Sequence, residues 1–328
     1  MQPETLGKEL MDVRQLLSRF SREHLGDFPT PLRHIQIGQQ RGFWMKDEGG
    51  SHHSYGGNKV RKLEYLFSWA KQNNKHRLVV WGDTASHTVE AVAILGRQCD
   101  FAINAVMYRS PSGGKVCKDN LSQIQRQVTV YKTNNILSAY LLARWKGMQA
   151  KSAYIPLGAT TAYSTLGHVS AACEFVEQWQ STYIRWPKAI YLAMGSGGTV
   201  AGLATGFALI GVPVTLNAVQ TVNTSITNKH TLHNQIADVL KLLDLDIKLA
   251  KAIISSHIHI DRRYLGKGYS DMNDASLDAV KQAETFGLDL EPVHTGKVMA
   301  AILHDIVLES DLNILYWHTH NHVSFTPV

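Results

Sequence analysis

The sequence predicts an α/β fold with mostly parallel sheets, each covered by helices on both faces. Short apolar runs of strand length alternate with helical patterns through most of the 328 residues. This order is typical of parallel strands joined by helical connections. A chain of this length, 44% hydrophobic and 18% charged, also suggests two globular domains with large cores.

The expected elements alternate regularly along the chain. The strands are expected at 78–81, 101–106, 128–131, 153–156, 189–194 and 314–317. The helices are expected at 60–72, 88–97, 135–149 and 166–179, with another beginning at Val200. Two glycines and a proline divide the apolar 203–219 stretch into helix, turn and strand. The alternation of His257 and His259 indicates the exposed face of an edge strand.

One lysine stands at the predicted start of the 60–72 helix. Two glycines and Asn58 precede Lys59, and Arg61 follows it. The positive end of the helix dipole and the cationic neighbour both favour a neutral amine at Lys59. A lysine needs a neutral amine to form a Schiff base with an aldehyde. The alternative is a glycine-rich turn capped by Asn58 and followed by an ordinary surface lysine.

A glycine-rich loop follows the strand expected at 189–194. This loop consists of Gly195, Ser196, Gly197, Gly198 and Thr199. Converging backbone N–H groups, the dipole of the next helix and two hydroxyls would bind a phosphate there. The spacing matches neither a Walker A loop nor a dinucleotide fingerprint. A reactive lysine and a separate phosphate loop together indicate a cofactor with both an aldehyde and a phosphate, which describes pyridoxal 5'-phosphate.

Bulk composition narrows the class of protein. The net charge is +6, but the basic residues are scattered, so we expect no nucleic-acid partner. Cys99, Cys117 and Cys173 are odd in number and lack metal-type spacing, which favours a reducing compartment. The first residues include charges and no apolar core, and the 203–219 stretch is interrupted. We therefore expect a soluble, cytoplasmic protein with no membrane span.

The order of several short motifs resembles that of a known family. The motifs are TPL at 30–32, KDE at 46–48, GGNKVRKLEYL at 56–66, IPLGA at 155–159, LGH at 166–168, GSGGT at 195–199, EPVHTGK at 291–297 and HT at 318–319. Together they span roughly nine-tenths of the chain. The chain resembles the fold type II (tryptophan synthase β-like) pyridoxal-phosphate enzymes, in the branch that holds D-cysteine desulfhydrase and 1-aminocyclopropane-1-carboxylate (ACC) deaminase.

This resemblance implies two three-layer α/β domains with the cofactor in the cleft between them. Residues 51–165 would form the small domain, and 1–50 with 166–328 the large one. The resemblance also implies a small amino-acid substrate and a homodimer. It implies that Lys59 holds the cofactor and moves the substrate's α-proton. Lys62 would reach the phosphate, unless it is an ordinary surface lysine, and Thr319 would contact the cofactor.

The turn after the 78–81 strand is the expected binding site for the substrate. Ser86, His87 and Thr88 open a helix, where hydroxyls and N–H groups suit a carboxylate. By resemblance, Ser86 stands where the deaminases place a catalytic serine, although it could simply cap the helix. His87 replaces the asparagine that is usual in the family beside the cofactor's ring hydroxyl. Its imidazole titrates near neutrality.

Thr295 is the position that best separates the two activities of the branch. By resemblance, the deaminases have a glutamate there, which keeps the pyridine nitrogen of the cofactor protonated. A threonine hydroxyl cannot do so, which favours β-elimination of a good leaving group over opening of a cyclopropane. His294 replaces a tyrosine expected from the family, and it is a candidate catalytic group. Tyr269 would supply a second phenol near the substrate.

The C-terminal segment departs most from the family pattern. The family has two glycines after His318 and Thr319, whereas this chain has His320, Asn321 and His322. Strand alternation predicts that the three histidines share one face. Three imidazoles on one face could bind zinc. We nevertheless expect no metal, because no nearby carboxylate or cysteine completes the set.

The sequence therefore predicts a pyridoxal-phosphate-dependent lyase or deaminase. The preferred hypothesis is D-cysteine desulfhydrase-type elimination, which gives a keto acid, ammonia and sulfide. ACC deaminase is the first alternative, supported by Ser86 and the Gly158-Ala159 pair, and a racemase or dehydratase stays open. A cofactor-binding protein with little or no catalysis is the second alternative, because His87, His294 and the 320–322 segment alter the pocket. Intact Lys59 favours altered specificity instead.

Overall fold

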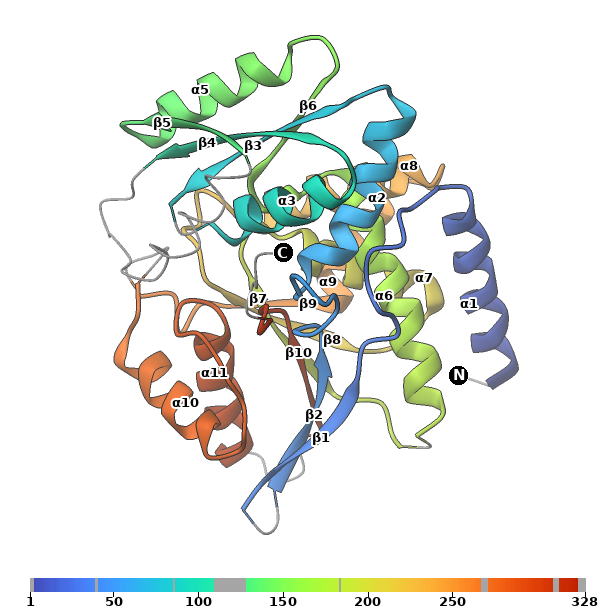
Figure 1. The fold of residues 1–328 in the computed structure, drawn as a ribbon. Coiled ribbons are helices and arrows are strands. Elements are labelled where there is room, and N and C mark those ends of the chain that lie inside the picture. The colour runs from blue at the N-terminus through green and yellow to red at the C-terminus, as the bar shows by residue number, and fades with distance from the viewer. Residues whose placement is uncertain are drawn as a thin grey trace.

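Two sheets organise the molecule. The computed structural model describes residues 3–38, 41–84, 86–108, 128–182, 184–266, 271–308 and 313–323. Their strands form one sheet of six strands and one of four, with helices on both faces of each (Figure 1). The predicted α/β fold with mostly parallel sheets is confirmed.

The four-stranded sheet is parallel throughout. Its order is β5 (Thr129–Thr133), β4 (Ala102–Tyr108), β3 (Arg77–Asp83) and β6 (Ser152–Ile155). Leu78 and Val80 of β3 belong to the core beneath α2 (Lys59–Gln72) and α3 (His87–Gln98). Val79 and Trp81 belong to the core beneath α5 (Ile136–Gly147). Because both faces of β3 are buried, it forms a continuous apolar run in the sequence.

The six-stranded sheet is parallel except at one edge. Its order is β1 (Leu32–Ile37), β2 (Arg41–Asp47), β10 (Ile314–His318), β7 (Ala189–Met194), β8 (Thr215–Gln220) and β9 (Ile258–Asp261). Only β1 and β2, among the described strands, pair in antiparallel fashion. The C-terminal strand β10 therefore lies in the interior of the sheet, beside β2 from the first fifty residues.

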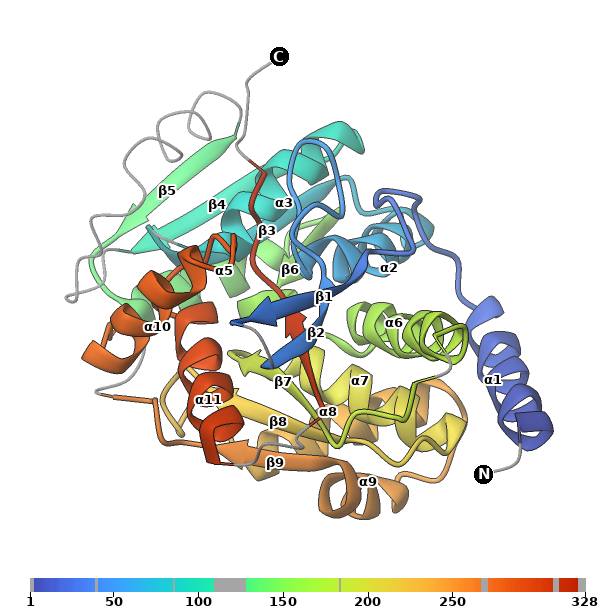
Figure 2. The same cartoon turned by 90° about the horizontal axis from the view of Figure 1, so that it is seen from below.

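Residues that alternate along the strands of the six-stranded sheet face two separate hydrophobic cores, one on each side of the sheet. Ile190, Leu192 and Trp317 pack beneath α1 (Pro3–Ser18), α6 (Ala162–Gln180), α7 (Gly198–Ile210), α8 (Lys229–Leu242) and α9 (Leu249–His257). Tyr191 and Tyr316 point the other way, against α10 (Asp274–Glu284) and α11 (Thr295–Leu308). Figure 2 shows α10 and α11 in front of this sheet, on the face opposite α7.

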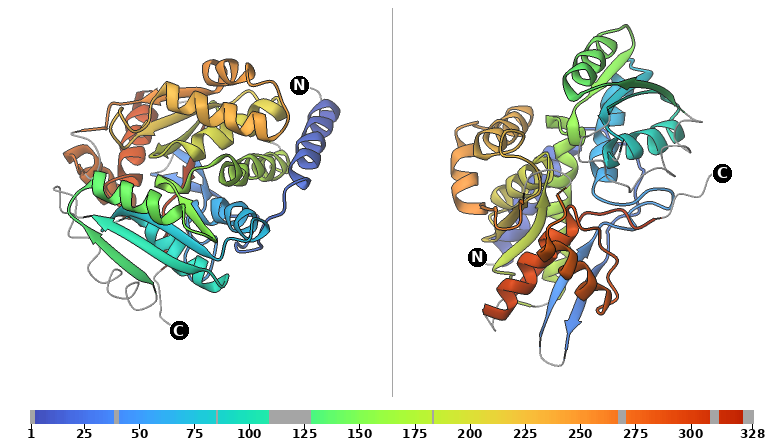
Figure 3. Two further views of the ribbon diagram at one scale, coloured as in Figure 1. Left: turned by 90° about the horizontal axis from the view of Figure 1, so that it is seen from above. Right: turned by 90° about the vertical axis from the view of Figure 1, so that its left-hand side faces the viewer.

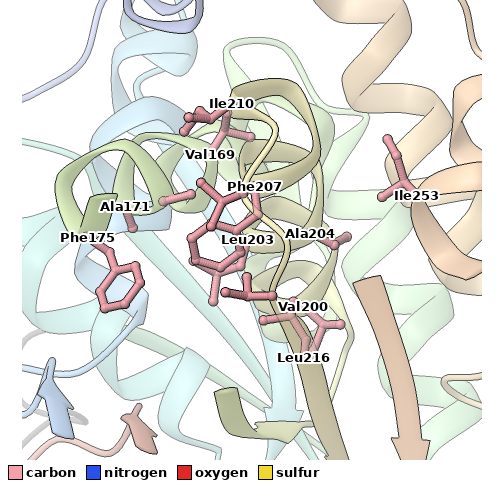
Figure 4. Close-up of a cluster of buried hydrophobic side chains, with 14 of the residues drawn as sticks. Val169, Ala171, Phe175, Val200, Leu203, Ala204, Phe207, Ile210, Leu216 and Ile253 are labelled. Carbon is pink, nitrogen blue, oxygen red and sulfur yellow. The ribbon is translucent and has the colours of Figure 1, made fainter. Parts of the chain in front are cut away.

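Helices α6 and α7 approach closely because α7 has glycines at the contact. A Cβ added to Gly202 would lie 2.5 Å from the Cβ of His168, and one added to Gly206 would lie 2.5 Å from that of Ala172. Side chains such as Phe175 and Leu203 fill the space around this contact (Figure 4). The close contact fixes the start of α7, which follows the glycine-rich loop.

The structure corrects the expectation that His257 lies on an exposed strand face, and it also bears on the expectation of a chain with no membrane span. His257 is the last residue of α9 and its Nδ1 lies 2.9 Å from the carbonyl oxygen of Val214, so it is not part of an exposed strand face. His259 does lie exposed on the edge strand β9. Among the described residues, no helix combines the length and apolar character needed to cross a bilayer.

Candidate active site

The carboxyl ends of strands from both sheets meet at one pocket. It is lined by the segments that follow β3, β7 and β10, and by the first turn of α2. Figure 3 shows the four-stranded sheet with its helices on one side of the molecule and the six-stranded sheet on the other. Ligands in open α/β sheets bind beyond the carboxyl ends of the strands. The pocket therefore lies where this fold predicts a ligand.

Lys59 is the first residue of α2, and its amine lies in the pocket. Nζ donates a hydrogen bond of 2.9 Å to Oδ1 of Asn58. Burial lowers the pKa of Lys59 to about 8. The expected direction is thus found, but its cause is different. Arg61 points away, into an ion pair of 2.6 Å with Glu48, and does not act on Lys59.

Asn58 joins the lysine turn to the glycine-rich loop instead of capping α2. Its side chain makes no capping bond, and Nδ2 donates to Oγ1 of Thr199 at 2.9 Å. Gly57 has φ +84° and leaves no space for a side chain, because an added Cβ would lie 2.9 Å from the carbonyl oxygen of Thr319. The lysine is thereby held by contacts to both the glycine-rich loop and the C-terminal segment.

The glycine-rich loop lies beside the hydroxyl of Thr160 and the side chain of Lys62 from α2. Gly197 has φ +89° and precedes α7. Oγ of Ser196 lies 2.8 Å from Oγ1 of Thr160, which in turn accepts a hydrogen bond of 3.0 Å from Lys62 Nζ. A Cβ on Gly198 would lie 2.9 Å from Lys62 Nζ. The closeness of loop and ammonium supports the predicted role of Lys62 in binding phosphate.

Burial disfavours the charged form of Lys62. Desolvation lowers its pKa well below the ordinary value, and the charge of Lys59 adds to this effect. Nζ of Lys62 donates hydrogen bonds to two neutral oxygens, the carbonyl of Gly158 and the hydroxyl of Thr160, each at 3.0 Å. A phosphate dianion at this position would stabilise the ammonium form.

Ser86 both caps α3 and lines the pocket. It is the N-cap residue of α3, accepting a hydrogen bond from the N–H of Val89 at 3.4 Å, and it also lines the pocket. His87 and Thr88 line the same wall. The ring of His87 lies 5.3 Å from that of His320, in an edge-to-face arrangement. The start of α3 thus offers an anion both a hydroxyl and the positive end of a helix.

Glu291 shapes the opposite wall of the pocket. Its carboxylate accepts hydrogen bonds from the N–H groups of Val293, His294 and Thr295, at 2.7, 2.7 and 2.8 Å. Thr295 is 1% exposed, and its hydroxyl bonds the backbone of Glu291. Nδ1 of His294 lies 2.8 Å from Oγ1 of Thr221. The start of α11 is therefore fixed by Glu291, a residue that sequence reasoning did not single out.

Two imidazoles of the pocket, those of His294 and His320, have lowered pKa values. Burial lowers the pKa of His294 to about 4 against the opposing charge of Glu291, and His87 and Lys59 add smaller lowering effects. Burial likewise lowers the pKa of His320 to about 3. These rings therefore act as hydrogen-bonding groups and not as cations in this pocket.

The C-terminal histidines do not share one face. Strand β10 ends at His318, whose Nδ1 lies 3.0 Å from Oδ1 of Asp47. The His322 ring stacks on that of His318 at 6.3 Å, whereas His320 lines the pocket. Our prediction was wrong on two points: alternation stops when the strand ends, and a carboxylate from a distant strand lies nearby.

Most sequence-derived site residues are brought together, with one outside the described part of the chain. The pocket includes Lys59, Lys62, Ser86, His87, Thr88, Gly195, Ser196, Gly197, Thr199, His294, Thr295 and Thr319, and a Cβ added to Gly198 would lie 2.9 Å from Nζ of Lys62. Tyr269 falls outside the described residues. Asn58, Thr160 and Glu291 were missed as site residues. Asn58 follows Gly57 and Glu291 precedes Pro292, which were the available signals for these two residues.

Comparison with known proteins decides the family. A model of the family described as "Pyridoxal-phosphate dependent enzyme" matches residues 24–319. The chain belongs to this family. It is accordingly a pyridoxal-phosphate-dependent enzyme, and its cofactor is pyridoxal 5'-phosphate.

Relatives and solved structures agree with this assignment. The chain is 30% identical over 325 residues to a protein of Salmonella typhi named D-cysteine desulfhydrase, covering 92% of this chain and 94% of that one. The structure of an ACC deaminase homologue has a TM-score of 0.78 at 22% identity, covering 98% of this chain and 95% of that one. An L-serine ammonia-lyase from Rhizomucor miehei has a TM-score of 0.63 at 18% identity, covering 89% and 93%. These two structures show the shared fold.

The pocket of this pyridoxal-phosphate enzyme fits its cofactor. Any side chain at Gly158 would collide with Ser196, so the space beside the loop exists only because of glycine. Residues of the glycine-rich loop, the hydroxyls of Ser196 and Thr160, and Nζ of Lys62 lie around that space, and such groups suit a phosphate. Lys59, with its lowered pKa, lines the same pocket and is the candidate for covalent attachment of the aldehyde.

Proposed function

We propose that this enzyme eliminates a β-leaving group from a small amino acid, with D-cysteine as its reference substrate. The products would be pyruvate, ammonia and sulfide. Thr295 is the observation that carries the proposal, because its buried hydroxyl bonds the backbone of Glu291 and offers no acid to the cofactor ring. The similarity to D-cysteine desulfhydrase over 92% of the chain supports it.

Different residues of the pocket would carry out different steps of this elimination. When bound, the cofactor withdraws electrons from the α-carbon of the amino acid. Lys59 would hold the cofactor and then move the α-proton, and a pKa of about 8 suits a base near neutral pH. Ser86 and the N-terminus of α3 would bind the substrate carboxylate. His294, neutral and hydrogen-bonded to Thr221, would face the substrate side chain.

Product analysis tests this proposal. Purified enzyme would be incubated separately with D-cysteine, L-cysteine and ACC, and sulfide, pyruvate and α-ketobutyrate would be measured. We expect sulfide and pyruvate from D-cysteine, and loss of both products in Lys59→Ala. Release of α-ketobutyrate from ACC without sulfide from D-cysteine would instead identify a deaminase. The position of Ser86 in the pocket favours this alternative.

The histidines of the pocket favour a further candidate, a cofactor-binding protein with little turnover. His87 and His320 pack edge to face where the family has asparagine and glycine by resemblance. A spectral titration of the yellow protein with a panel of D- and L-amino acids separates this candidate from an enzyme. We expect a change in the absorbance of the bound cofactor with at least one amino acid, and no change with any would favour the binding protein.

Location and assembly belong to the same proposal. The odd number of cysteines supports a reducing, cytoplasmic environment. The resemblance to the desulfhydrase and deaminase branch supports a homodimer. Light scattering of the purified protein tests the assembly, and a mass of one chain would contradict it.

A further inference from the structure

A second group of ionisable side chains lies beside the pocket and is not used by the proposed reaction. Asp47 ends β2 and His318 ends β10, and the two residues are paired directly across these parallel strands. His322 follows four residues later. One possible ligand atom from each of the three side chains can be chosen so that all lie within 4.8 Å of one another.

Two of these three side chains are deeply buried, and one has an unused nitrogen. Asp47 is 5% exposed and His318 is 3% exposed. Nδ1 of His318 faces Asp47, whereas its Nε2 is buried with no hydrogen-bond partner. Buried polar atoms without a partner are uncommon in folded proteins. Nε2 is therefore free to carry the ring proton when Nδ1 binds an ion.

The third side chain, His322, is held in place although it is exposed. Its ring lies over Gly49, where an added Cβ would collide with the imidazole, and 3.2 Å from a Cβ added to Gly50. Its backbone N–H donates to the carbonyl oxygen of Gly49 at 3.3 Å. The two glycines after Asp47 are therefore needed to let His322 approach the buried pair.

We propose that Asp47, His318 and His322 bind one divalent transition-metal ion of the zinc type. The set of two imidazoles and one carboxylate is a common one for zinc, and the exposed side of His322 leaves a fourth position for water. The 3.0 Å between Nδ1 of His318 and Oδ1 of Asp47 is close to the roughly 3.3 Å that separates two ligands of a tetrahedral zinc ion.

Neighbouring groups would orient the carboxylate for this role. Arg33 binds Oδ2 of Asp47 at 2.5 Å, and the N–H of Gly49 binds Oδ1 at 3.0 Å. Oδ1 therefore faces His318 and is the oxygen available to the ion. Nδ1 and Oδ1 are hydrogen-bonded to each other at 3.0 Å, and the ion would take the place of the shared hydrogen, with the proton of a neutral His318 ring moving to Nε2.

The site would position a wall of the active-site pocket. Residues 319–321, between the two histidine ligands, line the pocket. The carbonyl oxygen of Thr319 accepts the N–H of Asn58 at 3.2 Å, and Oδ1 of Asn321 accepts the N–H of Gly56 at 2.8 Å. An ion that joins His318 to His322 would close this short segment and fix it against the lysine turn.

Zinc titration of the full-length enzyme with bound cofactor tests the proposal. Metal would first be removed with a chelator, and zinc then added against a chromophoric competitor. We expect one equivalent bound per chain, and binding at least about tenfold weaker in His322→Ala. His259→Ala, which removes an exposed histidine on the edge strand β9, is the matched control and should bind as the unaltered chain does.

A second measurement reports the geometry of the site. Cobalt(II) added in place of zinc should give the visible absorption of a tetrahedral ion in the unaltered chain and in His259→Ala, but not in His322→Ala. Zinc should also raise the thermal unfolding temperature of the first two proteins only. Equal zinc affinity in all three proteins, or absorption typical of octahedral cobalt throughout, would overturn the proposal. Neither outcome depends on D-cysteine turnover.

Discussion

At the scale of single residues, the roles of Lys59, Arg61 and Lys62 depend on the partner that each side chain contacts. Arg61 and Lys62 are adjacent in sequence, but Arg61 binds buried carboxylates whereas Lys62 reaches the glycine-rich loop. Within the described part of the chain, the hydrogen-bond partner of Lys59 is neutral, the side-chain oxygen of Asn58. The chain thus separates three cations of one turn into a structural role, a phosphate-binding role and a reactive role.

The lowered pKa of Lys59 predicts how cofactor attachment depends on pH. Its pKa is about 8 instead of 10.5 because of burial, so the amine is protonated below pH 8 and neutral above it. Only the neutral amine attacks an aldehyde. The rate at which the cofactor-free protein acquires its yellow colour should therefore rise between about pH 7 and 9 and then level off.

Stopped-flow absorbance measures that rate, with Lys59→Ala as the control that should bind no cofactor covalently. Pyridoxal without its phosphate would be compared, to separate ionisation of the lysine from that of the cofactor phosphate. A rate that continues to rise up to pH 10.5 would show that the lysine is solvated and ordinary.

At the scale of elements, small residues set the distances between helices that position the loops. Gly202 lies on α7 at its contact with α6, and α7 follows the glycine-rich loop directly. Gly202→Ala should destabilise the protein by about 1–3 kcal/mol, because the added methyl group would press against His168 and Thr165. Alanine would otherwise favour the helix by roughly 1 kcal/mol.

Gly7→Ala on α1 is the matched control, since nothing lies within 4 Å of a Cβ added there. This variant should be neutral or more stable by up to about 1 kcal/mol. Urea unfolding followed by circular dichroism measures both variants. If the two substitutions had equal effects, close packing of α6 and α7 would not be what selects glycine at position 202.

The predicted elements also show which parts of the fold local patterns can reveal. Strands β3 and β7 were predicted because their central residues are buried and apolar on both faces. Strand β1 was not predicted, because His34 and Gln36 face solvent at the edge of the sheet. Helix α6 begins at Ala162, four residues before its predicted start, because Thr161 caps it.

The parts of the site formed by residues adjacent in sequence were predicted. The parts formed by residues distant in sequence were missed. Lys59 and the 195–199 loop each form a local pattern that indicates its chemistry. The contact between His318 and Asp47 joins residues 271 positions apart, so no spacing in the sequence reveals it. The cause of the lowered pKa of Lys59 was misjudged for the same reason, because the position of Arg61 depends on Glu174 in a distant helix.

At the scale of the whole molecule, one buried network ties the two sheets together. Glu174 of α6 accepts hydrogen bonds from Arg61 of α2 and from Lys46 of β2, at 2.8 and 2.5 Å. We propose that residues 51–165 form a small domain. With this division, the network would join the small domain to the large one. Because α2 begins at Lys59, this network also orients the reactive lysine.

Removal of one charge from this network should cost more stability than removal of an exposed one. Glu174→Gln leaves the buried cations Lys46 and Arg61 without their shared carboxylate, and should destabilise the protein by about 3–5 kcal/mol. Glu177→Gln removes an exposed partner of Arg14 and should cost less than about 1 kcal/mol. Urea unfolding at pH 7 measures both free energies.

The pH dependence of the difference in unfolding free energy between the unaltered chain and Glu174→Gln shows whether Glu174 acts through its charge. Burial alone would raise the pKa of Glu174, but the charges and hydrogen bonds of Arg61 and Lys46 lower it to about 2, from 4.5. A carboxyl with a lowered pKa stabilises the folded state fully above pH 4.5 and loses that contribution as the pH falls toward 2. The difference in unfolding free energy between the unaltered chain and Glu174→Gln should therefore shrink across this range. A difference that stays constant from pH 7 to 3 would mean that Glu174 acts through packing and not through its charge.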